Sequence, residues 1–220
     1  MQRKSLFIAS IVWAISIICV ASTFAVEIKF VQLLLPNPQV DGGRPLMQVL
    51  KDRSSSRSFS SEKLSAQVLS NLLWAAFGIN RLDTGKRTAP SAVNWQEIDI
   101  YVATADGLYL YEAKSQALKL ILPDDIRALT GRQDFVKEAP VNLIYVADFS
   151  KMGTAPKEDK ELYSAADTGF ISQNVYLYCA SERLSTVVRG SIDKQALAKA
   201  MKLRPDQKII LAQSVGYPKK

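Results

Sequence analysis

The residues best suited to chemistry in this chain lie between positions 53 and 59, where the sequence reads RSSSRSF. Arg53 and Arg57 stand four positions apart, with Ser54, Ser55 and Ser56 between them. Guanidinium groups bind phosphate oxygens through paired hydrogen bonds, and hydroxyl and backbone N–H groups supply further donors. The stretch therefore predicts a site for a phosphate ester. Taken alone, these residues also fit a solvated polar turn.

Much of the usual catalytic chemistry is excluded because the chain contains no histidine. Ser-His and Cys-His nucleophiles and the commonest metal ligand are therefore absent. Acidic neighbours at positions 124–125 and 158–159 are interpreted as solvated caps. No Walker loop, nucleophile elbow or Gly-x-Gly-x-x-Gly sequence occurs. If the chain is an enzyme, a bound cofactor has to supply the chemistry, and no metal is expected.

Composition indicates one globular domain that is either an ordinary basic protein or one with an anionic ligand. The chain has 220 residues, of which 48% are hydrophobic and 22% charged, and this is enough to bury a core. The net charge is +7, but the basic residues are scattered and are not interleaved with aromatic residues. A nucleic-acid partner is therefore not expected.

Residues 1–25 have the pattern of a secretory signal. Arg3 and Lys4 precede an apolar run from Leu6 to Val20, and small residues follow up to a cleavage point after Ala25. The pattern predicts an exported protein, placed in the periplasm. The alternative is an uncleaved membrane anchor, and the protein would be attached to a membrane only in that case. Cleavage would leave Cys179 as the single cysteine, so no internal disulfide is expected.

The elements that must position the arginine stretch follow from periodicity and caps. Residues 26–45 form an extended arm, with apolar residues 31–35 followed by prolines and glycines, and residues 46–220 form the domain. A short helix over 46–51 leads into Arg53. Ser65 is a suitable N-cap for a helix over 66–77, and Gly78 is a suitable C-cap.

The rest of the chain mixes hairpins with helices, which predicts an α+β fold. The alternating segments 98–102, 108–111 and 118–121 indicate an antiparallel meander, and the apolar segment 141–147 indicates a strand buried on both faces. Residues 80–89 and 151–160 are expected to be loops. The remaining expected elements are a short helix over 124–129, a long helix over 161–182, a strand over 185–188, a helix over 194–201 and a strand over 209–212.

Several short segments, each weakly informative alone, occur in an order that is characteristic of one family. Together they resemble the nitroreductase family of flavin mononucleotide (FMN) proteins, and most closely the branch that includes the thiazole- and oxazole-forming peptide dehydrogenases. The resemblance covers most of residues 46–218 and is carried by RSSSRSF at 53–59, LLWAAFGINR at 72–81, RTAPSAVNWQ at 87–96, DTGFISQN at 167–174 and VGYP at 215–218.

The resemblance implies a three-layer α/β/α fold with a central, mainly antiparallel sheet and FMN at a homodimer interface. It implies cofactor-binding roles in three groups. The phosphate, ribityl chain and pyrimidine edge would be held by Arg53, Ser54, Ser55 and Arg57, and Lys219 would close on the phosphate. The flavin ring would be approached from the partner chain by Pro90, Ser91, Ala92 and Asn94. Flavin N5 and O4 would face the backbone N–H groups of Arg189 and Gly190.

Two departures from the family pattern limit what is carried over. The family often has Glu-Gly where this chain has Arg189-Gly190, so only the backbone role is expected there. No residue pair matches those that deprotonate a peptide in the heterocycle-forming branch, so that reaction is not expected.

The resulting hypothesis is an exported FMN-dependent oxidoreductase with no catalytic side chain of its own. Ping-pong transfer through flavin N5 would take electrons from a small-molecule donor to a nitro, quinone or similar acceptor. FMN carries a dianionic phosphate, which explains the need for arginines and hydroxyls, and the flavin explains the absence of histidine. The alternative is a non-catalytic module on the same scaffold that binds a flavin or another phosphate ligand.

Overall fold

The computed structural model describes residues 32–219. The predicted signal and the first part of the arm, residues 26–31, lie outside this range. Within the described part of the chain, no helix has both the length and the apolar character needed to cross a membrane.

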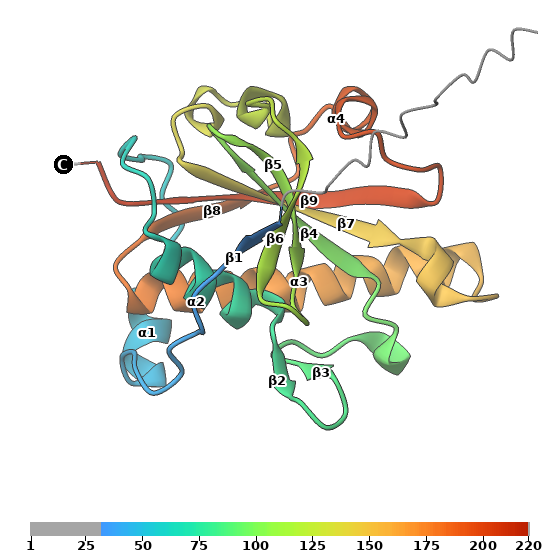
Figure 1. Cartoon of the computed structure of the whole chain (residues 1–220), viewed down its shortest axis with the longest axis horizontal. Coiled ribbons are helices and arrows are strands. Elements are labelled where there is room, and N and C mark those ends of the chain that lie inside the picture. The colour runs from blue at the N-terminus through green and yellow to red at the C-terminus, as the bar shows by residue number, and fades with distance from the viewer. Residues whose placement is uncertain (1–31, 220) are drawn as a thin grey trace, which may run out of the picture.

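A seven-stranded antiparallel sheet forms the centre of the molecule (Figure 1). The strand order is β1-β6-β5-β4-β7-β9-β8. The buried strand β7 (Val141–Asp148) lies between β4 (Ile98–Thr104) and β9 (Gln207–Gly216), as its continuous apolar sequence predicts. The other strands of the sheet are β1 (Gln32–Leu34), β5 (Gly107–Glu112), β6 (Ala117–Leu122) and β8 (Ser185–Arg189).

Helices α1 (Leu46–Asp52), α2 (Ala66–Phe77) and α3 (Lys157–Ser181) lie on one side of the sheet (Figure 1). The Ser65 hydroxyl accepts a hydrogen bond from the Val68 N–H at 3.2 Å, so α2 begins at its predicted cap. The buried residues of α2 and α3 form one core with the facing strands: Leu72, Leu73, Ala76, Phe77, Ile171, Val175, Ile100, Leu143 and Tyr145.

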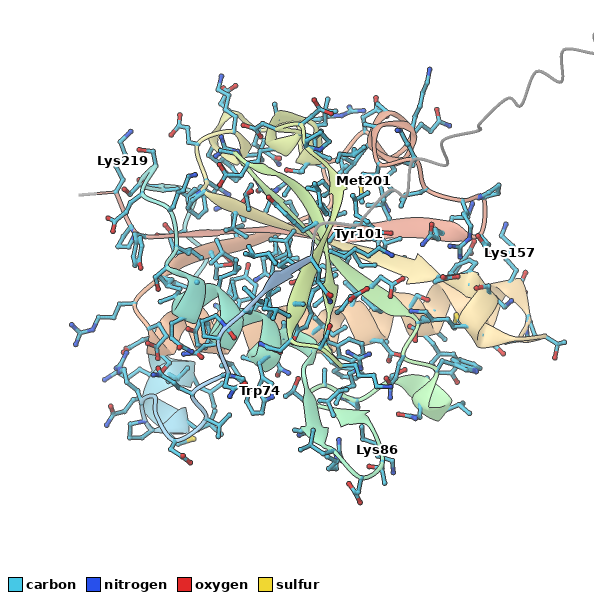
Figure 2. All side chains as sticks on the ribbon, in the orientation of Figure 1. Trp74, Lys86, Tyr101, Lys157, Met201 and Lys219 are labelled. Atoms are coloured by element: carbon cyan, nitrogen blue, oxygen red, sulfur yellow. The ribbon has the colours of Figure 1, made fainter. Side chains whose placement is uncertain are left out.

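The opposite face of the sheet is covered by α4 (Lys194–Ala200) and by two short 3-10 helices, Arg127–Thr130 and Asp134–Val136. Leu197 and Met201 pack there against Ile144 and Val146 of β7. Figure 2 shows Met201 above the sheet and Trp74 of α2 below it. The molecule therefore has three layers, and the predicted α+β architecture with an antiparallel sheet is confirmed.

Local details differ from the expectations where tertiary contacts decide. The loop expected at 80–89 contains a hairpin of β2 (Ile79–Arg81) and β3 (Lys86–Arg87). The helix expected at 124–129 is the 3-10 helix Arg127–Thr130, and the loop expected at 151–160 is shortened by the 3-10 helix Phe149–Met152 and by the start of α3 at Lys157. The arm contributes β1, which pairs with β6 of its own chain.

Candidate functional site

The arginine stretch leaves the end of α1 and runs along the outer edge of β8. The Ser56 N–H donates to the Thr186 carbonyl at 2.9 Å, and the Ser185 hydroxyl lies 3.1 Å from the Ser56 hydroxyl. Because β8 is the last strand of the sheet, this edge has unpaired backbone groups. The stretch therefore occupies part of an open sheet edge and is not a free polar turn.

The guanidinium groups of Arg53 and Arg57 are available to a ligand. Within residues 32–219, neither donates a hydrogen bond or forms an ion pair. Arg53 is half-buried, and its guanidinium carbon lies 5.2 Å from the centre of the Tyr176 ring. Arg57 is exposed. By contrast, Arg44 at the start of α1 is bonded to Asp52 and to the Ala180 carbonyl. Two unpaired cations with free donors at this edge suit an anion.

Tyr176 of α3 joins the stretch to β8, and sequence reasoning did not identify it. Its hydroxyl lies 2.9 Å from the Ser55 hydroxyl and accepts a hydrogen bond from the Val188 N–H at 3.0 Å. The residue is 7% exposed. The available signal was a tyrosine on the face of α3 that also carries the buried Ser172 and Cys179. A hydroxyl on a buried helix face needs a partner, but the sequence does not say which.

Gly190 lies on the same open edge, directly after β8. The outward groups of β8 alternate, so the Thr186 carbonyl is bonded to Ser56 and the Val188 N–H to Tyr176. By this alternation the Gly190 N–H also faces outward, and in the described part of the chain it has no hydrogen-bond partner. Gly190 is exposed. The edge therefore presents a free backbone donor close to Ser55 and Tyr176.

The Arg189 side chain is buried and points into the layer that contains α4 and the 3-10 helix Arg127–Thr130. It donates to the Ser214 hydroxyl at 3.2 Å, to the Asn142 side-chain oxygen at 2.7 Å, and to the carbonyl and hydroxyl of Thr130. Burial lowers the pKa of Arg189 to about 10. Its guanidinium thus does not reach the open edge. By the alternation of β8, the Arg189 N–H faces Ala212 of β9, so of the two N–H groups expected at the flavin only that of Gly190 lies on the open edge.

The turn at 90–96 has an unusual backbone held by buried carboxylates. Val93, Asn94 and Gln96 all have positive φ angles, of 52°, 59° and 49°. The Ser91 hydroxyl accepts from the Gln96 N–H at 2.8 Å and donates to Glu97, and the Asn94 side-chain oxygen accepts from the Gln96 amide at 3.1 Å. The turn exposes Pro90 and Asn94 and leaves the other predicted residues half-buried.

Two acids anchor this turn. The Ala92 N–H donates to Asp167 of α3 at 2.9 Å, and Asp167 is 2% exposed. Glu97 is fully buried, and one of its carboxylate oxygens has no hydrogen-bond partner within the described residues. Burial raises the pKa of Glu97, and the neighbouring Asp167 carboxylate raises it further. These acids position the turn and were not singled out from the sequence.

The turn and the arginine stretch are not brought together within one chain. The turn contacts α3 at Asp167, whereas the arginine stretch contacts it at Tyr176, nine residues further on. At 1.5 Å per residue, these points are about 13 Å apart along the helix axis. The structure therefore places Pro90, Ser91, Ala92 and Asn94 about 13 Å along α3 from the arginine stretch of the same chain.

Two cavities flank the C-terminal segment. A cavity of about 410 Å³ is lined by Ser54, Ser56, Tyr176 and Pro218, and by the guanidinium-bearing residues Arg44 and Arg183. A larger one, of about 1140 Å³, is lined by Pro218 and Lys219 and by apolar residues such as Leu64, Leu69 and Tyr109. Figure 2 shows exposed Lys219 beside the C-terminus, at the opposite end of the molecule from Lys157. Lys219 thus lines the same cavity as Phe59, the last residue of the stretch.

The fold defines a class of three-layer α+β proteins with an antiparallel sheet, and comparison with known proteins specifies the family. The nitroreductase family model matches residues 50–217. A protein of Methanocaldococcus jannaschii that carries the nitroreductase name is 30% identical over 169 residues, which cover 72% of this chain and 85% of the relative. The chain belongs to the nitroreductase family, a family of oxidoreductases.

Solved structures agree with this assignment. A nitroreductase-family protein of Ralstonia eutropha superimposes with a TM-score of 0.83 at 43% identity, covering 86% of this chain and 90% of that one. One from Desulfovibrio desulfuricans, solved in complex with FMN, has a TM-score of 0.59 at 25% identity and covers 81% and 89%. The Escherichia coli microcin synthetase McbBCD complex shares the fold, with a TM-score of 0.66 at 21% identity and coverage of 96% and 85%.

The residues at the β8 edge fit an FMN molecule chemically. A phosphate needs cationic and hydroxyl donors, which Arg53, Arg57 and Ser54 supply. A flavin ring edge has acceptor atoms, and the free N–H of Gly190 is a donor on the same edge. A β-carbon added at Gly190 would come no closer than 3.6 Å to its nearest neighbour, a Leu211 methyl group, so the backbone there is open.

Proposed function

We propose that this protein is an exported FMN-dependent oxidoreductase that works as a homodimer. It takes electrons from a small-molecule donor and passes them to a nitro, quinone or similar acceptor, and bound FMN would supply this two-electron chemistry. The observation that carries the proposal is the pair of unpaired guanidinium groups, Arg53 and Arg57, on the edge of β8 that also carries the free Gly190 N–H.

Each residue of the edge receives a defined role. Arg53, Arg57 and Ser54 bind the phosphate, because they are the donors there without protein partners. Ser55 is fixed by Tyr176 and orients the ribityl chain or the pyrimidine edge. The Gly190 N–H binds the flavin ring at N5 or O4. The complex of the Desulfovibrio desulfuricans relative with FMN supports this choice of cofactor.

A second copy of the chain completes the site. The exposed face of α3 carries the apolar side chains of Leu162, Tyr163 and Phe170, which are 63%, 39% and 49% exposed, together with the small exposed residues Ala165, Ala166 and Gly169. A face of this kind is suited to close packing against another helix. Pairing through α3 would let the partner supply Pro90, Ser91, Ala92 and Asn94 to the site.

Export constrains the electron donor. NAD(P)H is not supplied outside the cytoplasm, so an exported enzyme requires another small-molecule reductant. N-terminal sequencing of the mature protein tests the export step. A sequence starting at Val26 supports cleavage after Ala25, whereas retained Met1 supports the membrane-anchor alternative.

The absorption spectrum of the purified protein tests the cofactor. Yellow protein with flavin bands that bleach on reduction and return with a quinone or nitro acceptor is the expected result. Colourless protein that takes up no added FMN would overturn the proposal. Yellow protein that no acceptor reoxidises faster than free FMN would leave only the non-catalytic binding module.

A further inference from the structure

Arg189 is a buried cation without an acidic partner. Its side chain is 5% exposed, and the atoms that accept its hydrogen bonds belong to Ser214, Asn142 and Thr130, all of them uncharged. Within residues 32–219, no carboxylate forms an ion pair with it. Burial is the only cause of its lowered pKa, which at about 10 still leaves it protonated at neutral pH. Buried charges are normally paired, so this one needs an explanation.

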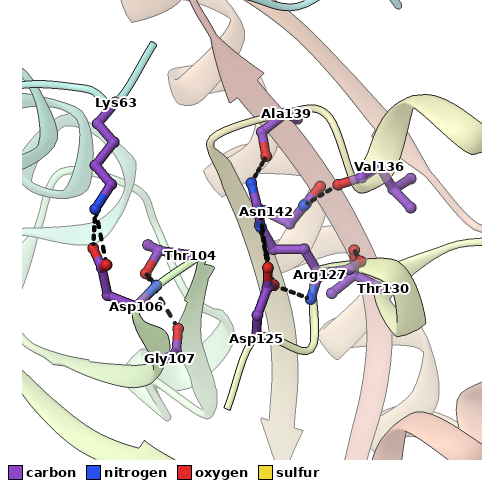
Figure 3. A network of polar contacts seen from close by, with 10 residues as sticks. All are labelled: Lys63, Thr104, Asp106, Gly107, Asp125, Arg127, Thr130, Val136, Ala139 and Asn142. Atoms are coloured by element: carbon purple, nitrogen blue, oxygen red, sulfur yellow. Dashed lines mark hydrogen bonds and ion pairs between the residues drawn. The ribbon is translucent and has the colours of Figure 1, made fainter. Parts of the chain in front are cut away.

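Another arginine in the same layer, Arg127, does have an acidic partner. Arg127, in the same layer, donates to the Asp125 carboxylate at 2.8 Å and also to the Ala139 carbonyl (Figure 3). Asn142, which faces Arg189, is fixed by its own bond to the Val136 carbonyl at 2.7 Å (Figure 3). The Arg189 guanidinium is thus rigidly held among neutral oxygen atoms. No anion within this network balances its positive charge.

The position of the Arg189 charge indicates which anion it could stabilise. Arg189 directly precedes Gly190, whose free N–H faces the proposed flavin ring at the β8 edge. Two-electron reduction adds negative charge to a flavin ring, while the FMN phosphate keeps its charge. We infer that Arg189 is an electrostatic tuning residue, whose buried charge raises the reduction potential of FMN bound at this edge; this inference rests on the proposed function.

The size of the effect follows from Coulomb attraction. If the ring lies about 10 Å from the guanidinium, a unit charge at an effective dielectric constant of about 20 would favour the reduced ring by roughly tenfold. For a two-electron couple, tenfold corresponds to about 30 mV. Arg189 does not touch the flavin, and it acts through its field alone. Any substitution that neutralises this charge should therefore lower the potential, whatever else it does to the network.

The test is potentiometry on FMN-loaded protein with three variants. Arg189→Gln removes the charge and keeps a donor, Arg189→Lys keeps the charge and loses the planar fork, and Asn142→Asp places a carboxylate against the intact guanidinium. We expect Arg189→Gln and Asn142→Asp to lower the midpoint potential by about 30 mV, the tenfold change above, and Arg189→Lys to stay close to the wild type. Thermal unfolding of each apoprotein checks that the variants fold.

The possible outcomes separate this inference from the proposed function. Wild-type protein that binds no FMN removes the proposed function itself. If the wild type binds FMN and neither neutralising variant lowers the potential, the tuning role is overturned. An equal drop in Arg189→Lys and Arg189→Gln would also overturn it, because that result assigns the effect to the network's structure and not to its charge. If Arg189→Gln does not fold, Asn142→Asp, which keeps the arginine, decides the question.

Discussion

The Ser55 hydroxyl lies 2.9 Å from the Tyr176 hydroxyl, and this contact ties the proposed cofactor-binding stretch to the long helix α3. Tyr176 also accepts the Val188 N–H at 3.0 Å and lies under the Arg53 guanidinium. One side chain therefore holds three parts of the β8 edge in place. This arrangement makes the edge rigid before a ligand arrives, which reduces the entropy lost on binding.

Replacing Tyr176 by phenylalanine tests this junction. Tyr176→Phe leaves the Val188 N–H without an acceptor and frees Ser55, so we expect a loss of about 1–3 kcal/mol in the free energy of unfolding and weaker FMN binding. Urea unfolding and a fluorescence titration with FMN measure the two effects. Tyr163→Phe, on the exposed face of the same helix, is the matched control for the unfolding measurement alone and should change stability little. Unchanged stability and affinity in Tyr176→Phe would contradict the role of the junction.

Arg57 is expected to contribute to ligand binding and not to stability. Arg57 is exposed and has no partner within the described residues, so Arg57→Ala should alter the free energy of unfolding by less than about 0.5 kcal/mol. Loss of a charge-assisted bond to phosphate should weaken FMN binding by roughly tenfold or more. Lys114→Ala, which removes one exposed charge in the turn before β6, controls for net charge. Normal flavin content in Arg57→Ala would remove the phosphate-site assignment.

Local chemistry explains which parts of the fold could be predicted. The bounds of α2 follow from Ser65 and Gly78, whose cap geometry depends on neighbouring residues. The central position of β7 follows from its apolar sequence alone. The β2–β3 hairpin was missed because its strands are short and polar and are held in part by a side-chain bond from Arg87 to the Phe77 carbonyl.

The site was only partly predictable because its residues come from distant segments. Arg53, Ser55 and Gly190 could be named from the family pattern, since each lies in a short motif. Tyr176 could not be, because its partners are 121 and 12 residues away in the sequence. Likewise, the unpaired state of Arg189 depends on Thr130, Asn142 and Ser214, which only the tertiary structure brings together.

The buried Glu97 predicts a pH-dependent stability. Burial, reinforced by Asp167, raises the pKa of Glu97 in the folded protein, so the folded state binds more protons than the unfolded state above the ordinary carboxyl pKa of about 4.3. The wild type therefore loses stability as the pH rises from there to the raised pKa, by about 1.4 kcal/mol for each pH unit that separates the folded and unfolded pKa values.

Glu97→Gln should remove this loss. Glutamine can still accept the Ser91 hydroxyl bond and can donate to Asp167, without a buried charge. Melting temperatures at pH 4.5, 6 and 8 should show the variant gaining on the wild type as the pH rises. The exposed Glu138→Gln provides the control, for which no such trend is expected. If the difference between Glu97→Gln and the wild type is the same at all three pH values, Glu97 is not the titrating group.

Substitution on α3 tests whether a second chain completes the site. Phe170 is 49% exposed on the face proposed for pairing, so Phe170→Lys should place an unpaired charge in that interface and shift the protein to a monomer. If the partner supplies the turn at 90–96 to the site, as proposed, the monomer should lose FMN as well. Sedimentation measures the mass, and the absorption spectrum measures the flavin.

Leu129→Lys is the matched control for that substitution, because Leu129 is 44% exposed in the layer on the opposite side of the sheet. It changes the net charge equally and should leave both dimer and flavin intact. A Phe170→Lys monomer that retains FMN at wild-type affinity would show that one chain forms the site alone, and the proposed role of the partner's Pro90 to Asn94 would then fail. Loss of flavin together with the dimer, and only in Phe170→Lys, ties the cofactor to the interface.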